Sequence, residues 1–476
     1  MTGSAWRDPL EQMDAAVLDR SLREALDRAL GLARRKRDDA MEELPDPAAA
    51  RRRAAEIRRY AVDNLGALLR RLEDALEAGG VRVHWARDAA EAVSAVCRVA
   101  EAAGVRTAAL SKSMVAEELG LEKALTGAGI EVVQTDLGER ILQLSQDRPS
   151  HITAPCLHLR AEDVGRIFER TLGTPFSDDP ERLSRAAAAD LRPRFLSADL
   201  GITGVNVAVA DSGTLVIVEN EGNVRMVTTL PRILVSVTGI EKVVPDRAAA
   251  LDLLQLLGRS ATGQRWPGYI TWMPPAWPRE GPRPERHVVL VDNGRSRVHA
   301  SGRYRSLLWC IRCGACMNAC PVYGRVGGHA YGTVIPGPVG AALSPLLAPG
   351  PGTARLPQAS SLCGECANIC PVMIPLHSHL VHLRGDPAAL GGHGGPGPRE
   401  RLSFRLWRWF MGGRRRYGLS LWLHRMAERL APRLVGRVAA RLGWGGLRLR
   451  PRPAEVPFRA RWRVLSNRPP GNGGPP

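Results

Sequence analysis

The sequence predicts an α/β domain with a largely parallel sheet, followed by a cysteine-rich helical segment and a basic helical tail. Strand-like and helix-like patterns alternate from about residue 61 onward, which favours a parallel sheet covered by helices. Seven of the nine cysteines gather between residues 310 and 370, and arginines dominate after residue 398. The chain of 476 residues is long enough for two or three such parts, each with its own core.

The predicted elements follow one another in a consistent order. Residues 7–60 are rich in Arg, Glu and Ala at helical spacing and predict a helical arm. Two Val-rich strands within 204–222 flank Asp211-Ser212-Gly213 and predict a hairpin. We expect helices near 61–78 and 88–103, and further strands at 81–86, 105–110, 130–136, 232–244 and 287–294. The resulting domains are the arm at 1–60, the α/β domain at 61–296, the cysteine-rich domain at 297–392 and the tail at 393–476.

The first cysteine run, CIRCGACMNACPVY at 310–323, has the spacing Cys310-x2-Cys313-x2-Cys316-x3-Cys320-Pro321. This is the bacterial ferredoxin pattern, in which two-residue gaps fold a tight loop that presents three thiolates to one [4Fe–4S] cluster. The three-residue gap carries the fourth thiolate to a neighbouring cluster. The run therefore predicts a pair of iron–sulfur clusters.

The second run, Cys363-x2-Cys366-x3-Cys370-Pro371, repeats the pattern with Ser360 at the place of the first cysteine. The crossed arrangement assigns one cluster to Cys310, Cys313, Cys316 and Cys370, and the other to Cys320, Cys363 and Cys366. The second cluster is then a [4Fe–4S] cluster whose last iron binds Ser360, Ser361, water or a partner's group, or it settles as [3Fe–4S]. A pair of zinc sites is the alternative, but two nearly matching runs with an x3-Cys-Pro step favour iron–sulfur clusters.

The other two cysteines are isolated in the sequence. Cys97 lies within an apolar helical pattern and is expected in the core. Cys156 lies near His151 and His158, which makes a catalytic or metal role there a weaker alternative. The spacing of His377, His379 and His382 does not place all three on one helical face, so we expect them beside the clusters or at the surface.

The first 20 residues are polar where a signal peptide would be apolar, and the weakly polar run 326–351 is interrupted by Pro and Gly. We therefore expect a cytoplasmic protein, in which clustered cysteines are ligands or catalysts rather than disulfides.

The positive charge of the chain is concentrated in its tail. Residues 399–476 hold 19 arginines and 3 glutamates, a net charge of +16 out of +18 for the chain. Basic amphipathic helices of this kind dock on a partner protein or lie on an anionic membrane surface, here the inner face, and no nucleic acid is expected. One apolar stripe is formed by Leu402, Leu406, Trp409 and Phe410 beside Arg401, Arg405 and Arg408, and another by Leu434, Val438 and Leu442 beside Arg433, Arg437 and Arg441.

Several long stretches resemble a single family. They are LSKSMVAEELGL (110–121), GIEVVQTDLGERILQL (129–144), PSHITAPCLH (149–158), residues 198–231, GIEKVVP (239–245), the first cysteine run and GGHAYGTVIPGPVGA (327–341). Together they closely resemble the lactate utilization protein B family, iron–sulfur proteins of bacterial L-lactate oxidation. The resemblance implies a LUD domain, similar in fold to the ribose-phosphate isomerase/CoA-transferase group, and a double-cluster ferredoxin segment with three cysteines in its second run.

The resemblance also implies a role. The chain would be the electron-transfer subunit of a complex with lactate utilization proteins A and C that converts L-lactate to pyruvate, so that lactate serves as a carbon source. Two other functions stay open on the residues alone: electron transfer for another substrate in a heterodisulfide-reductase-like complex, and a redox-sensing scaffold.

Candidate site residues of the α/β domain lie at strand ends, where ligands of open α/β sheets bind. Capping of helices and turns is their alternative role, and no residue is assigned a catalytic role. No G-x-G-x-x-G follows a strand and opens a helix, so no flavin or nicotinamide site is predicted. The candidates are Lys112, Asp136, Glu139, Glu219 and Glu221, and Lys112 and Lys242 stand out because the chain has only four lysines.

Overall fold

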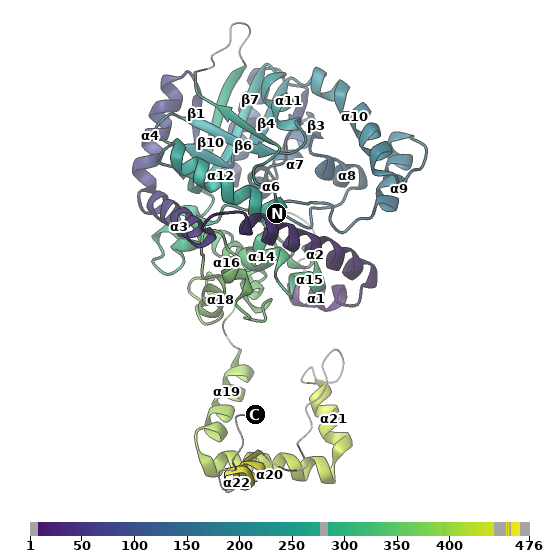
Figure 1. Cartoon of the computed structure of the whole chain (residues 1–476), viewed down its shortest axis with the longest axis vertical. Coiled ribbons are helices and arrows are strands. Elements are labelled where there is room, and N and C mark those ends of the chain that lie inside the picture. Colours follow the sequence, from purple (N-terminus) through teal and green to yellow (C-terminus); the bar gives the residue numbers. More distant parts are fainter. Residues whose placement is uncertain are drawn as a thin grey trace. The chain divides into compact units, whose positions relative to one another are not determined.

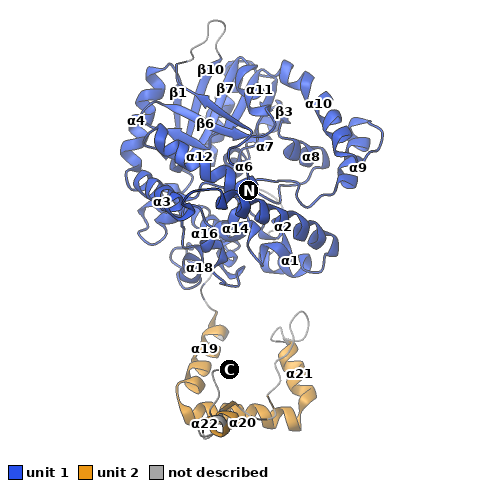
Figure 2. Cartoon of the chain, in the orientation of Figure 1, with its two compact units in different colours: residues 1–395 blue, residues 396–476 orange. Residues whose placement is uncertain are grey.

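The structure, a computed structural model, describes residues 8–276, 284–393, 395, 397–441, 454, 456 and 458–466. The chain divides into two units, Met1–Gly395 and Pro396–Pro476, coloured blue and orange in Figure 2. The first unit holds the strands, the cysteine loops and the N-terminal helices, whereas the described elements of the second are all helices.

A six-stranded sheet lies in the first unit, with the strand order β1-β10-β7-β4-β2-β3 (Figure 1). All neighbouring strands in it are parallel, so the predicted parallel sheet is confirmed. β7 is buried along its whole length, as expected for a strand covered on both faces. The strands are β1 (Arg82–Ala86), β2 (Thr107–Leu110), β3 (Glu131–Gln134), β4 (Leu200–Gly204), β7 (Ile233–Gly239) and β10 (Glu285–Val291).

Helices cover both faces of this sheet, because successive side chains of a strand point to opposite faces. On one face, Val235 and Val237 join an apolar cluster with α5 (Ala89–Ala102), α6 (Met114–Leu119) and α7 (Leu121–Gly127). On the other face, Leu234 packs with α4 (Leu65–Ala78) and with a second sheet. That face also carries α10 (Pro180–Ser197), whose Phe195 contacts β2.

The second sheet has four strands in the order β8-β5-β6-β9. Its strands are β5 (Val207–Val209), β6 (Thr214–Glu219), β8 (Val243–Val244) and β9 (Tyr269–Met273). β5 and β6 pair antiparallel, which confirms the predicted hairpin. The single strand expected at 232–244 is instead divided: β7 ends at Gly239, a 3-10 turn (η1, Ile240–Lys242) follows, and β8 enters the other sheet. At Gly239 a Cβ would clash with the carboxylate of Glu241, which folds back beside the turn.

The N-terminal helices are α1 (Pro9–Ala16), α2 (Arg20–Glu42) and α3 (Pro47–Asp63). Aspartates 8, 19 and 46 cap their first turns. In α2, Leu26 is fully buried in an apolar cluster with Tyr323 of the cysteine-rich region. Arg51 of α3 donates hydrogen bonds to the carbonyl oxygen of Cys370. The helical arm therefore packs along the cysteine-rich region.

Short helices build the cysteine-rich region around an apolar core. Its helix α16, which lies within the weakly polar run, is buried over almost its whole length, and Tyr323 and Tyr331 are less than 2% exposed. The elements are α13 (Arg295–Ala300), η2 (Arg305–Trp309), α14 (Ala315–Asn318), α15 (Tyr323–Val326), η3 (His329–Tyr331), α16 (Gly337–Leu347), η4 (Thr353–Gln358), α17 (Glu365–Asn368) and α18 (Leu376–Arg384). The remaining helices of the first unit are α8 (Leu137–Ser145), α9 (Ala161–Leu172), α11 (Asn223–Thr229) and α12 (Arg247–Thr262).

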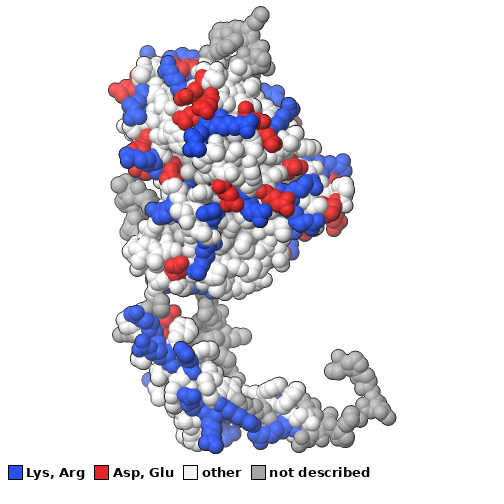
Figure 3. All heavy atoms as spheres, turned by 90° about the vertical axis from the view of Figure 1, so that its left-hand side faces the viewer, with Lys and Arg blue, Asp and Glu red and all other residues white. Residues whose placement is uncertain are grey.

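The second unit contains α19 (Pro398–Met411), α20 (Arg414–Leu430), α21 (Pro432–Arg441) and α22 (Phe458–Ser466). The predicted apolar stripe on α19 is exposed, with Leu402 at 57% and Trp409 at 50%. Leu442, which belongs to the second predicted stripe, lies outside the described residues. Figure 3 shows many basic and few acidic side chains on the face of this unit in view. In the described part of the chain, every helix is too short or too polar to cross a membrane.

Candidate functional site: two cysteine loops and an adjoining cavity

The two cysteine runs fold into loops with the same backbone shape. Each has a left-handed residue immediately before a cysteine: Arg312 with φ +60° before Cys313, and Leu362 with φ +58° before Cys363. In both loops a glycine with positive φ follows that cysteine, and a short helix, α14 or α17, begins next. Because left-handed backbone is uncommon for Arg and Leu, this conformation is a property of the loop rather than of either side chain.

Ser360 takes the same place in the second loop that Cys310 takes in the first. The backbone N–H of Arg312 donates to Sγ of Cys310 over 3.4 Å. The backbone N–H of Leu362 donates to Oγ of Ser360 over 3.1 Å. The serine oxygen is therefore held two residues before the left-handed turn in the way the cysteine sulfur is held.

All nine cysteines are free thiols, and the seven of the two runs lie in loops that converge beside the arm. Cys313, Cys316, Cys366 and Cys370 are buried, Cys310 and Cys320 are partly buried, and Cys363 is exposed. Burial raises the pKa of Cys366 to about 12 and that of Cys370 to about 11. Such thiols keep their protons until a metal displaces them. Buried, convergent and unbridged sulfur atoms fit an iron–sulfur group.

The cysteine thiols shift one another's pKa values, and these shifts divide the thiols into two groups of neighbours. Besides burial, Cys370 and Cys310 raise the pKa of Cys313. Cys320 and Cys363 raise that of Cys366 in the same way. Cys316 is affected first by Cys310, Cys313 and Cys370, and less by Cys366. Charges act on a pKa at short range, so these effects report which sulfur atoms are neighbours.

A cavity of about 260 Å³ lies where the carboxyl ends of the strands meet the first cysteine loop. Four of the five predicted site residues line it: Lys112, Asp136, Glu219 and Glu221. The fifth, Glu139, lies one turn into α8 and does not line the cavity, but its pKa responds to Lys112 and Asp136. The structure therefore brings together most of the candidates that were predicted from strand ends.

The three predicted carboxylates that line the cavity also stabilise local backbone, as the capping alternative predicts. Asp136 accepts the N–H of Glu139 at the start of α8. Glu221 accepts the N–H of Leu137 over 2.9 Å. Glu219 accepts the N–H of Val224 over 2.7 Å at the start of α11. Capping and cavity lining are thus combined in the same side chains.

Burial changes the protonation of the acidic groups around Lys112. It raises the pKa of Glu139 and that of Glu221 to about 7, and that of Glu117 to about 8. Near neutral pH, these carboxyl groups can therefore hold or release a proton.

Two arginines of the cavity wall, Arg295 and Arg312, were not predicted, and Lys242 was noted only for the rarity of lysine. Arg295 is 1% exposed and pairs with Glu241 (Nε to Oε2, 2.6 Å) and Glu118 (Nη2 to Oε2, 2.8 Å). Lys242 is 8% exposed at the end of the 3-10 turn after β7. Arg312 is a spacer between two cysteines, and spacer positions carry no signal in a cysteine motif.

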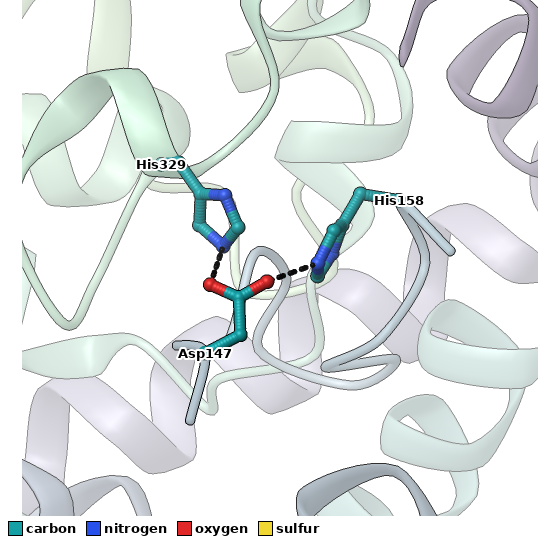
Figure 4. Close-up of side chains that lie close together, drawn as sticks. All are labelled: Asp147, His158 and His329. Carbon is teal, nitrogen blue, oxygen red and sulfur yellow. Dashed lines mark hydrogen bonds and ion pairs between the residues drawn. The ribbon is translucent and has the colours of Figure 1, made fainter. Parts of the chain in front are cut away.

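A separate polar cluster joins the α/β domain to the cysteine-rich region (Figure 4). In it, Nε2 of His158 lies 2.9 Å from a carboxylate oxygen of Asp147, and Nε2 of His329 lies 3.9 Å from the other oxygen. Both histidines also have other partners, because Nδ1 of His158 bonds Oγ of Ser150 and His329 donates to the carbonyl oxygen of Arg148. This cluster therefore forms a hydrogen-bonded contact between the two regions.

Two further histidines and the two isolated cysteines have structural surroundings. His151 is buried and bonds Asn318 of α14 over 3.1 Å. Cys156 packs beside an apolar cluster, and burial raises its pKa, which argues against a reactive thiolate. Cys97 is partly buried and packs against the apolar cluster under the sheet rather than inside the core, where it was expected. His379 is buried and bonds Oγ of Ser306.

Residues 69–300 match the family described as the LUD domain, and residues 306–374 match the 4Fe-4S dicluster domain. The cysteine-rich region is therefore an iron–sulfur domain. A crystal structure titled as a DUF162 family protein from Deinococcus radiodurans covers 48% of the chain and 98% of its own, at 16% identity and a TM-score of 0.28, and this likeness adds nothing to the assignment.

Relatives match both regions of the first unit together. An "Uncharacterized electron transport protein YkgF" of Escherichia coli is 45% identical over 72% of each chain. Lactate utilization protein B of Macrococcus caseolyticus is 43% identical over 77% of each chain, and that of Bacillus subtilis is 41% identical over 89% of this chain and 87% of its own. With a LUD domain, an iron–sulfur dicluster domain and this level of identity, the chain belongs to the lactate utilization protein B family.

Proposed function

We propose that this chain is the iron–sulfur electron-transfer subunit of a cytoplasmic complex that oxidises L-lactate to pyruvate, with lactate utilization proteins A and C as its partners. The observation that carries the proposal is the pair of cysteine loops, which share one backbone shape within a region that matches the dicluster family. The names of the relatives, as lactate utilization and electron transport proteins, support it. Oxidation of a 2-hydroxy acid releases two electrons and two protons, and a bound pair of clusters accepts electrons one at a time.

We assign the first cluster to Cys310, Cys313, Cys316 and Cys370, and the second to Cys320, Cys363 and Cys366. The two groups of neighbouring thiols support this crossed assignment, because Cys370 acts on Cys313 whereas Cys320 acts on Cys366. We place the fourth ligand of the second cluster at Ser360. The Oγ atom of Ser360 accepts a backbone hydrogen bond in the same way as the sulfur of Cys310 does.

Deleting the gene is expected to abolish growth on L-lactate as sole carbon source, in a strain without another lactate oxidase, while growth on pyruvate continues. A plasmid copy of the full chain should restore growth, and a Cys316→Ala copy should not, because Cys316 is a buried ligand of the first cluster. Chain purified without oxygen should carry about seven or eight iron atoms with matching sulfide. Unimpaired growth of the deletion strain, or zinc in place of iron, would contradict the proposal.

The second unit is proposed to dock on a partner subunit. Its helices carry exposed apolar side chains such as Leu402, Phe404 and Trp407 beside arginines, and exposed apolar surface of this kind marks interaction sites. When tagged chain is captured from cells, the full chain should co-purify with protein A or C, and a chain ending at residue 395 should not. Retained co-purification together with salt-sensitive binding of the full chain to anionic liposomes would assign the tail to a membrane surface instead.

Ser360→Cys is expected to complete the second cluster. Because Oγ of Ser360 is already placed like the sulfur of Cys310, a thiolate at this position should bind the remaining iron. The variant should gain about one iron per chain or lose any [3Fe–4S] EPR signal. The exposed neighbour Ser361 supplies the control: Ser361→Cys should leave iron content and EPR unchanged, and equal effects of the two variants would refute this placement.

A further inference from the structure

We propose that the cavity between the α/β sheet and the first cysteine loop binds a small 2-hydroxy- or 2-oxocarboxylate, whose carboxylate is held by Lys242 and Arg312. The proposal deepens the proposed function, on which the identity of the ligand rests. The position of the site rests on the geometry alone.

Lys242 presents an unpaired ammonium group to the cavity. Its side chain lines the cavity and is 8% exposed. Its neighbour Glu241 is directed to Arg295, at 2.6 Å, and among the described residues no hydrogen bond or ion pair joins the Lys242 ammonium. A buried cation without a partner is costly, so a ligand with a negative charge would be stabilised here.

Arg312 presents a second unsatisfied donor beside the same cavity. Its side chain is 10% exposed and lines the cavity, and its buried Nη1 has no hydrogen-bond partner. Its Nη2 lies 3.7 Å from Oε1 of Glu241, which is beyond hydrogen-bond distance. A guanidinium group suits a carboxylate, because its N–H groups match both oxygens.

The second cysteine loop shows that the first does not need arginine at this position. Leu362 has the same left-handed backbone in the second loop and is 37% exposed. Since leucine serves there, the guanidinium of Arg312 is not required for the loop conformation. We attribute the arginine at position 312 to the ligand that its guanidinium group would contact in the cavity.

The charges around this end of the cavity do not balance. Arg58 and Arg295 are buried beside Lys242 and Arg312, whereas the acidic groups among them are Glu118 and Glu241. Arg58 is satisfied by backbone carbonyl oxygens, including those of Val243 and Leu308. Cys310 also lies near Lys242, but Nη1 of Arg312 still lacks an acceptor. A ligand carboxylate would supply both a charge and acceptors.

Other groups that line the cavity suit a hydroxyl or carbonyl group. Glu219 and Glu221 line it together with Asn206 and Asn220, and their carboxylate and amide groups accept and donate hydrogen bonds. The volume of about 260 Å³ is below that of pockets for drug-sized ligands. A short acid with one anionic end and one neutral polar end therefore fits better than a nucleotide or a bulky phosphate ester.

Anaerobic calorimetry on the full, cluster-loaded chain tests this inference, with sodium L-lactate, pyruvate, propionate and inorganic phosphate as probes. Lactate or pyruvate should bind, and Lys242→Gln and Arg312→Leu should each weaken binding about tenfold or more, the usual effect of losing a charge-assisted hydrogen bond. Arg312→Leu copies the residue of the second loop, so its iron content and visible spectrum should stay unchanged. Lys123→Gln, at an exposed lysine of the same domain, should bind like the parent chain.

Equal affinities of the Lys242→Gln and Lys123→Gln variants, or no binding of either acid to the parent chain, would overturn the inference. Binding of phosphate but not of lactate or pyruvate would overturn the carboxylate assignment. Weaker binding of propionate than of lactate would support the polar end of the site. If the deletion strain grows on lactate while the cavity still binds a carboxylate through Lys242, the proposed function fails and this site stands.

Discussion

Cys370→Ser is expected to alter the same EPR signal as Cys310→Ser, although the two residues lie 60 positions apart in the sequence. In the crossed arrangement, the last cysteine of each run binds the cluster of the other run. Cys370 is buried; burial raises its pKa most, the backbone N–H of Ile374 lowers it, and Cys310 is the next cause and raises it. Each substitution should therefore remove or distort the first cluster and lower the iron content by up to about half.

The complementary pair is Cys320→Ser and Cys363→Ser, which should alter the other signal. Cys363 acts on the pKa of Cys320, in agreement with a shared second cluster. Cys97→Ser provides the control, because Cys97 packs against the apolar cluster under the sheet and should leave both signals intact. If Cys370→Ser instead disturbed the signal that Cys363→Ser disturbs, each run would bind its own cluster and the crossed assignment would be wrong.

Arg295→Met is expected to lower the free energy of unfolding by about 3–5 kcal/mol, the usual cost of removing one partner from a buried ion pair. Arg295 is 1% exposed and binds both Glu118 and Glu241. Burial raises the pKa of Glu241, but Arg295, Lys242 and Arg312 more than offset burial and hold it at about 2. Without Arg295, the carboxylates of Glu118 and Glu241 would lose their shared hydrogen-bonded partner in the interior.

The pH dependence identifies the cause of this loss. With its main partner removed, the pKa of Glu241 in the folded variant should rise. The destabilisation should therefore be largest above that raised pKa and shrink as the pH falls from there toward about 2, the pKa of Glu241 in the folded parent chain. Anaerobic thermal unfolding of both proteins at several pH values measures this. Arg265→Met is the control, because Arg265 pairs with Glu43 at the surface and should change the Tm little. An equal loss at every pH would point to lost packing instead.

Local patterns predicted much of the fold, because they depend on neighbouring residues. The strands expected at 81–86, 105–110 and 130–136 correspond to β1, β2 and β3, and the Asn-Gly turn after β10 has positive φ at both residues. The position of β10 between β1 and β7 depends on long-range pairing that no local pattern encodes. The division of 232–244 was missed because its apolar residues continue through Gly239 while the chain changes sheets.

The candidate site was predictable on its sheet side only. Strand-end reasoning found Lys112, Asp136 and the two hairpin glutamates, because carboxyl ends of parallel strands share one edge. Arg312 could not be found in this way, since it enters the cavity from the cysteine-rich region, whereas Arg295 follows the turn after β10 and was missed although it lies at a strand end. Their role depends on how two segments far apart in sequence pack together.

The exposure of Cys363 indicates a direction for electron transfer through the first unit. With the ligand sets proposed above, the cluster of Cys310 and Cys313 adjoins the cavity through Arg312, whereas the cluster of Cys363 reaches the surface. The first cluster would thus exchange electrons with the cavity, and the second with the surroundings of the chain. A protein that exchanges electrons with this chain must approach the face around Cys363, so current and small molecules would enter and leave by separate routes.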